Sequence, residues 1–212
     1  MRANALVGAT LVATVLAGPA CHERRGGAPQ GPEPVPVGVY KGVIDDGEGK
    51  TRRFGLLLWA DLPDRFHAEL LPPVGGPEVI VDGGGGRLAI TLVRERTAYV
   101  GPASRAAIEA VAGVPVPVED LVRWIVVAAD PVPRDVEVTR QPERAGGLPK
   151  RLEIRAGGRT LTIERRRLDA RGALAAGAGT GAAPPGVAER PLEELPGAAA
   201  AASLGADERE RP

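Results

Sequence analysis

The chain has 212 residues, and its 27 basic and 27 acidic side chains give a formal net charge of zero. No broad positive field therefore attracts nucleic acid, and we expect no nucleic-acid partner. With only two residues each of Trp, Tyr and Phe, the core must be built from Leu, Val and Ile, and Trp59 and Trp124 are expected to be important packing points.

The N-terminal segment has the pattern of an export signal. A basic start is followed by an uncharged apolar stretch over residues 5–18, and Cys21, the only cysteine, comes shortly after it. The stretch has the length of a signal h-region and is too short to span a bilayer. This predicts a lipoprotein-type signal peptide over residues 1–20 and acylation of Cys21. Ordinary secretion with a free thiol is the alternative, because Gly18 and Pro19 are unusual in a lipoprotein signal.

Composition divides the rest of the chain into three parts. Residues 21–36 are rich in Pro and Gly and predict an extended linker. Residues 37–168 have the apolar patterning of one folded domain. Residues 169–212 are rich in Ala, Gly and Pro, so we expect a disordered tail in which only Val187 and the segment 191–195 could dock.

Apolar and polar residues alternate at period two through the central domain, which predicts strands with one buried face. Glycine- and proline-rich segments at 72–77, 82–86 and 157–158 predict the turns between strands. An antiparallel, meander-like sheet follows. The buried faces are expected at Phe54, Leu56 and Leu58, at Phe66, Ala68 and Leu70, at Leu88, Ile90 and Leu92, at Val136 and Val138, at Leu152 and Ile154, and at Leu161 and Ile163.

Two segments break this alternation and have helical spacing. Residues 102–112 precede Gly113, a residue type that commonly ends helices. In the second segment, acidic residues in the first turn precede Leu121, Trp124 and Ile125, which are spaced i, i+3 and i+4. We expect this second helix to lie flat on an apolar surface.

The second helix belongs to the most specific motif of the chain. Residues 113–125 read Gly-x-Pro-x-Pro-x-x-x-Leu-x-x-Trp-Ile, in which the prolines give an extended lead-in to the helix. Together with the export signal, the segment Leu-Leu-Pro-Pro-Val-Gly-Gly at 70–76 and Tyr-Val-Gly at 99–101, this motif resembles the outer-membrane lipoprotein receptors of the Lol sorting pathway. The resemblance to this LolA/LolB-like family covers about residues 39–168.

The resemblance implies a mainly β fold, an open and incomplete antiparallel β-barrel with a helical plug or lid. Its apolar interior would bind the acyl chains of other lipoproteins and aid their insertion in the outer membrane. The expected partners are an acylated lipoprotein or lipid and a periplasmic carrier. The residues expected to line the cavity are Leu56, Leu58, Phe66, Leu70, Leu88, Ile90, Leu92, Leu121, Trp124 and Ile125, with core packing as the alternative for the last three.

The resemblance also implies a cellular location and an oligomeric state. It would be a monomer tethered by lipid to the outer membrane of a Gram-negative bacterium and facing the periplasm. His22, rather than an aspartate, follows Cys21 and agrees with the outer membrane. Val74 matches an exposed aliphatic residue in the family's cargo loop, although it could equally be a turn residue without a function.

The chain departs from the family after Leu168, where the family continues with further strands and this sequence becomes rich in Ala and Gly. A more open barrel is therefore expected. A second interpretation remains, in which an envelope lipoprotein uses the same β-domain to bind or assemble with another protein. The arginines at 165–167 are expected to form a solvated strand end, which could also contact lipid phosphates.

Residues typical of enzymes are scarce, so we expect no enzyme, metal or cofactor. His67 is predicted to be an exposed residue on the outer face of a strand, and Ser104 and Ser203 lie outside known nucleophile motifs. The glycine run at 83–86 is not followed by the Lys-Ser/Thr of a phosphate loop. The segment 45–49 fails the EF-hand spacing and is expected to be a hairpin tip.

Overall fold

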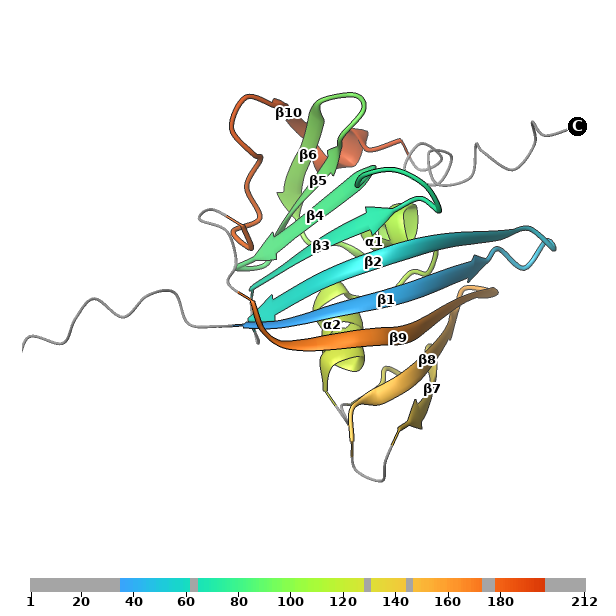
Figure 1. Cartoon of the computed structure of the whole chain (residues 1–212). Helices are drawn as coiled ribbons and strands as arrows, with labels where there is room; N and C mark the ends of the chain where they lie inside the picture. Colours follow the sequence, from blue (N-terminus) through green and yellow to red (C-terminus); the bar gives the residue numbers. More distant parts are fainter. Residues whose placement is uncertain (1–34, 62–64, 128–130, 144–146, 173–177, 197–212) are drawn as a thin grey trace, which may run out of the picture. The chain divides into compact units, whose positions relative to one another are not determined.

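The computed structural model describes residues 35–61, 65–127, 131–143, 147–172 and 178–196 (Figure 1). The predicted signal peptide, Cys21 and most of the predicted linker lie outside these residues. The part of the linker that is described, Val35 and Pro36, already belongs to the first strand.

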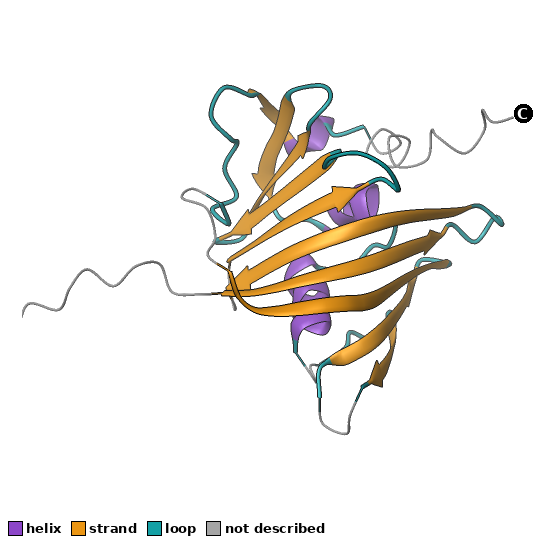
Figure 2. Cartoon of the chain, in the orientation of Figure 1, coloured by secondary structure: helices purple, strands orange, loops and turns teal. Residues whose placement is uncertain are grey.

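The described residues form one ten-stranded sheet with the order β10-β6-β5-β4-β3-β2-β1-β9-β8-β7 (Figure 2). Neighbouring strands are antiparallel except for β10, which is parallel to β6. Because β10 and β7 remain as two edges, the sheet is not closed, and the expected mainly β fold with an open antiparallel sheet is confirmed. The strands are β1 (Val35–Asp45), β2 (Thr51–Asp61), β3 (Arg65–Leu71), β4 (Val79–Gly84), β5 (Arg87–Leu92), β6 (Thr97–Pro102), β7 (Glu137–Pro142), β8 (Pro149–Ala156), β9 (Arg159–Gly172) and β10 (Ala188–Pro191).

Most of the predicted turns are confirmed. At the tip between β1 and β2, the carboxylates of Asp45 and Asp46 accept the backbone N–H groups two residues further on, each at 2.9 Å. The glycine-rich segment after Asp82 is a turn only in its second half. Gly83 and Gly84 continue β4, whereas Gly85 and Gly86 turn the chain at φ angles of 58° and 73°.

The concave face of the sheet has glycines directly under its aromatic rings. Gly42 on β1 pairs with Phe54 on β2, and a Cβ atom at Gly42 would overlap the Phe54 ring. Gly83 pairs with Phe66 in the same way across β3 and β4. The missing side chains let the rings lie close to the backbone, an arrangement that also allows a sheet to bend sharply.

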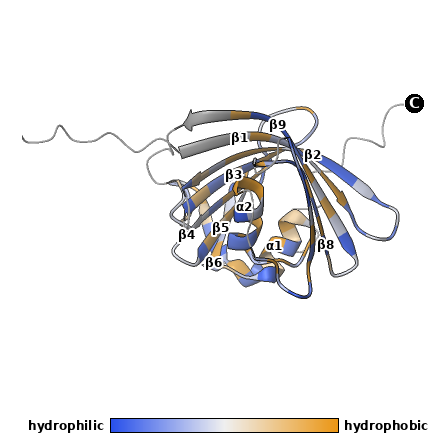
Figure 3. Ribbon diagram, turned by 90° about the horizontal axis from the view of Figure 1, so that it is seen from below, coloured by the Kyte–Doolittle hydropathy of each residue, from blue (hydrophilic) through white to orange (hydrophobic). Residues whose placement is uncertain are grey.

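Two helices lie inside the curve of the sheet (Figure 3). In α1 (Arg105–Ala112), the Oγ of Ser104 accepts the N–H of Ala107 at 3.2 Å, and Gly113 ends the helix at a φ of 77°. Helix α2 (Val118–Val126) has two acidic residues in its first turn and buries Leu121, Trp124 and Ile125, among others. The two predicted helices and the predicted stop at Gly113 are therefore confirmed.

Residues 178–196, which we call the C-terminal strap, pack against the sheet. Ala183 and Val187 contact a small apolar cluster on β5 and β6, and β10 extends the sheet beyond β6. Leu192, in a 3-10 helix η1 (Leu192–Glu194), is only 6% exposed and joins the main core. This corrects the expectation of a disordered tail from residue 169, while docking of Val187 and of segment 191–195 agrees with the sequence. A few apolar residues suffice here because the sheet edge already provides a surface and backbone partners.

Candidate functional site

The apolar interior lies between the concave face of the sheet and the two helices. It contains a small cavity of about 60 Å³. Its wall is made entirely of apolar side chains from β2, β3, β4, β9, α1 and α2. They are Phe54, Leu56, Leu58, Phe66, Ala68, Leu70, Val81, Ile108, Val111, Ala112, Val118, Leu121, Val122, Ile125, Leu161 and Ile163.

The structure brings together six of the ten side chains that the sequence assigned to a cavity. These six are Leu56, Leu58, Phe66, Leu70, Leu121 and Ile125. The other four, Leu88, Ile90, Leu92 and Trp124, are buried in the same core but do not line the cavity. The first three lie on β5, which is not among the strands that form the cavity wall. Trp124 is fully buried, and its Nε1 donates to the carbonyl of Pro131 at 3.2 Å.

Sequence reasoning missed several residues of the cavity wall, although a signal for most of them was present. Phe54 and Ala68 belong to the same alternating faces as the predicted residues on β2 and β3. Leu161 and Ile163 were predicted to be buried on β9 but were not assigned to a cavity. Period-two alternation identifies the buried face of a strand, but it does not reveal which buried faces meet.

The volume of the cavity limits what the interior can bind in this conformation. Pockets for drug-sized molecules enclose about 300–1,000 Å³. The cavity here, at about 60 Å³, is several times smaller. The cavity in this conformation is therefore too small for an acyl chain.

The loop between β3 and β4 presents an apolar side chain to solvent. Val74 is 74% exposed, the highest value among the large apolar residues described as exposed. It follows two prolines and precedes Gly75, whose φ of 117° favours glycine. The structure thus places Val74 at the tip of this loop.

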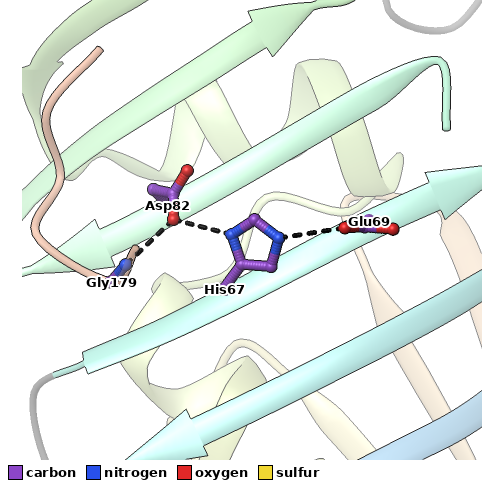
Figure 4. Close-up of polar contacts among 4 residues, drawn as sticks. All are labelled: His67, Glu69, Asp82 and Gly179. Carbon is purple, nitrogen blue, oxygen red and sulfur yellow. Dashed lines mark hydrogen bonds and ion pairs between the residues drawn. The ribbon is translucent and has the colours of Figure 1, made fainter. Parts of the chain in front are cut away.

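A polar cluster lies on the convex face of the sheet, opposite the helices (Figure 4). The Nδ1 of His67 lies 2.8 Å from Oδ1 of Asp82, and its Nε2 lies 3.2 Å from Oε1 of Glu69. The backbone N–H of Gly179, in the C-terminal strap, donates to the same Oδ1 of Asp82 at 2.9 Å. We call these four residues the convex-face cluster.

The prediction that His67 is exposed is wrong, because its side chain is only 16% exposed. The residue does lie on the outer face, as predicted, but Asp82 and the ring of Trp59 flank it, the latter in an edge-on contact with centroids 5.2 Å apart. Burial is the largest single influence and lowers the pKa of His67. The hydrogen bonds to Asp82 and Glu69, with their charges, together exceed it, so the pKa is raised above its ordinary value.

In the arginine cluster on β9, Arg166 and Arg167 are exposed, as expected for a solvated strand end, whereas Arg165 is not. Arg165 has a side chain only 12% exposed and pairs with Glu143 at 3.0 Å, whereas Arg166 is more exposed and pairs with Glu164. Arg165 lies opposite Tyr40 on β1. Burial raises the pKa of Tyr40 to about 12, although the charge of Arg165 offsets part of this effect, so the phenol is neutral at any physiological pH.

Two further features bear on the function. No helix within the described ranges combines the length and the apolar character needed to cross a bilayer. Across the same residues, no three His, Cys, Asp or Glu side chains converge as the ligands of a metal ion would.

Comparison with known proteins gives only remote similarities. No protein-family model matches the chain, and no curated protein matches it. An uncharacterised conserved protein of Thermus thermophilus is similar in structure, with a TM-score of 0.40, 11% identity, and coverage of 74% of this chain and 90% of that one. A Vibrio parahaemolyticus domain assigned to outer-membrane lipoprotein sorting has a TM-score of 0.39, 9% identity, and coverage of 66% and 86%. These values assign the chain to no family. What the structure itself defines is an open antiparallel sheet that encloses two helices and a small apolar cavity.

Proposed function

We propose that this protein binds acyl chains in the apolar interior beneath α1 and α2. The observation that carries the proposal is the composition of the cavity wall, in which every lining side chain is apolar. An interior without polar groups offers nothing to a polar ligand, whereas a hydrocarbon chain gains free energy by leaving water at about 25 cal/mol per Å².

In this proposal the described conformation is the closed, unliganded one. Leu121, Val122 and Ile125 present one side of α2 to the cavity, so a shift of α2 would enlarge the space next to β2 and β3. Pro115 and Pro117 precede the helix and restrict the backbone of its lead-in. We therefore assign α2 the role of a lid.

The remaining parts of the proposal concern the membrane. Acylation of Cys21 would anchor the protein to the outer membrane, with the domain facing the periplasm. Val74, exposed on its loop, would contact lipid or the acyl chains of a lipoprotein cargo as the cargo enters the membrane. A periplasmic carrier would deliver that cargo to a monomeric receptor, and no chemical reaction is involved.

A second candidate function is supported by the small cavity. Because about 60 Å³ is far below the volume of a ligand pocket, the domain could keep its core permanently filled. It would then serve as a protein-binding or assembly module of the envelope.

Uptake of a fluorescent fatty acid by protein lacking residues 1–21 distinguishes the two candidates. The matched variants are Leu56→Gln, on the cavity wall, and Leu57→Gln, on the opposite face of the same strand. Acyl binding predicts uptake by the unmodified protein and by Leu57→Gln, with strongly reduced uptake by a folded Leu56→Gln. Absence of saturable uptake by the unmodified protein would favour the assembly module.

A further inference from the structure

The convex-face cluster joins the C-terminal strap to the centre of the sheet. Gly179 is the strap residue involved, and its N–H reaches Asp82 on β4 across 97 positions of the chain. The backbones are also close here, because a Cβ atom at Gly84 would overlap the carbonyl of Gly179. Asp82 is only 5% exposed, so its carboxylate depends on protein partners rather than on water.

Only a doubly protonated ring satisfies both polar contacts of His67. A neutral imidazole has one N–H donor and one acceptor, whereas both ring nitrogens of His67 face carboxylate oxygens, which only accept. Only the imidazolium can donate to Asp82 and Glu69 at once. When the proton is lost, one nitrogen lone pair faces a carboxylate, and Asp82 loses the adjacent positive charge.

Two ion pairs lie near this face. Arg65 on β3 forms an ion pair with Asp61 of β2, and Glu78, just before β4, pairs with Arg94 at 2.6 Å. From β2, the side chain that contacts the histidine ring is Trp59, which carries no charge. On β5, Ala89 lies opposite Asp82, and Arg87 precedes Ala89 by two residues on the same strand. Glu69 and Asp82 are therefore the carboxylates that contact the imidazolium directly.

We propose that His67 is a pH-dependent switch that fastens the C-terminal strap to the convex face when it is protonated. Protonated His67 neutralises Asp82, and Asp82 in turn accepts the hydrogen bond from the strap. The contribution to docking is fully present below the ordinary pKa of histidine, about 6.5, and is lost as the pH rises through the higher pKa of the folded protein.

Loosening of the strap has a structural consequence at the sheet edge. Strand β10 covers the edge of β6 through a four-residue parallel ladder. If the strap separates there, β6 becomes an unpaired edge strand that can accept another extended segment. The switch thus links the protonation of one histidine to the availability of a sheet edge. This inference does not depend on the proposed binding of acyl chains.

Hydrogen exchange at the strap amides tests the proposal in the full chain. The protection factor of the Gly179 amide, corrected for the intrinsic effect of pH, is measured between about pH 6 and about pH 9, which bracket the usual histidine pKa. We expect protection to fall by about tenfold for each pKa unit by which docking raises the pKa of His67. A protection factor that stays constant over this range would overturn the proposal.

Two variants make the test specific. In Glu69→Gln the new amide can donate to a neutral ring nitrogen, so double protonation is no longer required. Asp82 remains beside the ring, so the pH dependence should weaken and move to lower pH. Asp61→Asn, on the same face but without a contact to His67, should keep the dependence. An equal pH profile in Glu69→Gln and in the unmodified chain would contradict the switch.

The titration of the ring itself supplies a readout that needs no variant of the cluster. The chain has two histidines, so replacement of His22 by Gln leaves His67 as the single histidine signal in an NMR titration. We expect its pKa above about 6.5. A pKa at or below that value would also overturn the proposal.

Discussion

Truncation of Leu192 tests whether the C-terminal strap is part of the folded domain. The side chain is 6% exposed and belongs to the main core cluster, and its Cβ lies so near β6 that a Cβ atom at Gly101 would come within 2.7 Å of it. Leu→Ala changes at buried sites cost about 2–5 kcal/mol, with larger values where a sealed cavity remains.

The surroundings of Leu192 place the expected cost near the lower end of this range. Leu192 lines a hollow of about 510 Å³ next to α1, together with Pro102, Ala106 and Leu195, among others. Space freed by the substitution would merge with this hollow, so the penalty for a sealed cavity is small. We expect Leu192→Ala to lower the free energy of unfolding by about 2–3 kcal/mol.

Urea unfolding measures this change directly. Glu193→Ala, in the same turn but exposed, is the matched control and should change the free energy of unfolding by less than about 0.5 kcal/mol. If Leu192→Ala costs no more than this control, the strap does not contribute to the core, and the reasoning is refuted.

Four further results are expected. Gly42→Val should lower the free energy of unfolding by at least about 1–3 kcal/mol in urea, since the new side chain overlaps Phe54, and an unchanged midpoint would contradict this packing. Ser104→Ala should cost about 1 kcal/mol in the same assay through loss of the α1 cap, whereas Ser104→Asp should not. Because folding raises the pKa of His67, its contribution to the free energy of unfolding should be present at about pH 6 and decline by about pH 9, and His67→Gln should remove this part of the difference. Val74→Asp should leave the midpoint unchanged but reduce delivery of lipoproteins to vesicles; normal delivery would remove Val74 from the proposed function.

The sequence predicted local structure well because local structure depends on periodicity and on turn chemistry. Alternation of apolar residues identified the inner faces of β2, β3, β5, β8 and β9, and Gly113 marked the end of α1. The apolar spacing of Leu121, Trp124 and Ile125 predicted the buried face of α2. Each of these patterns is complete within about ten residues, so no distant contact is needed to interpret it.

The tertiary structure decided what depends on contacts between distant segments. Leu88, Ile90 and Leu92 have the same alternation as the cavity residues, yet β5 lies outside the cavity wall because strand order, not periodicity, determines which faces meet. His67 looked exposed from its own strand, but Asp82 and Trp59 on the two neighbouring strands flank its ring. The composition of the tail showed only that it is poor in apolar residues. The edge of β6 decided that part of it folds, because an existing surface lowers the number of apolar contacts that folding requires.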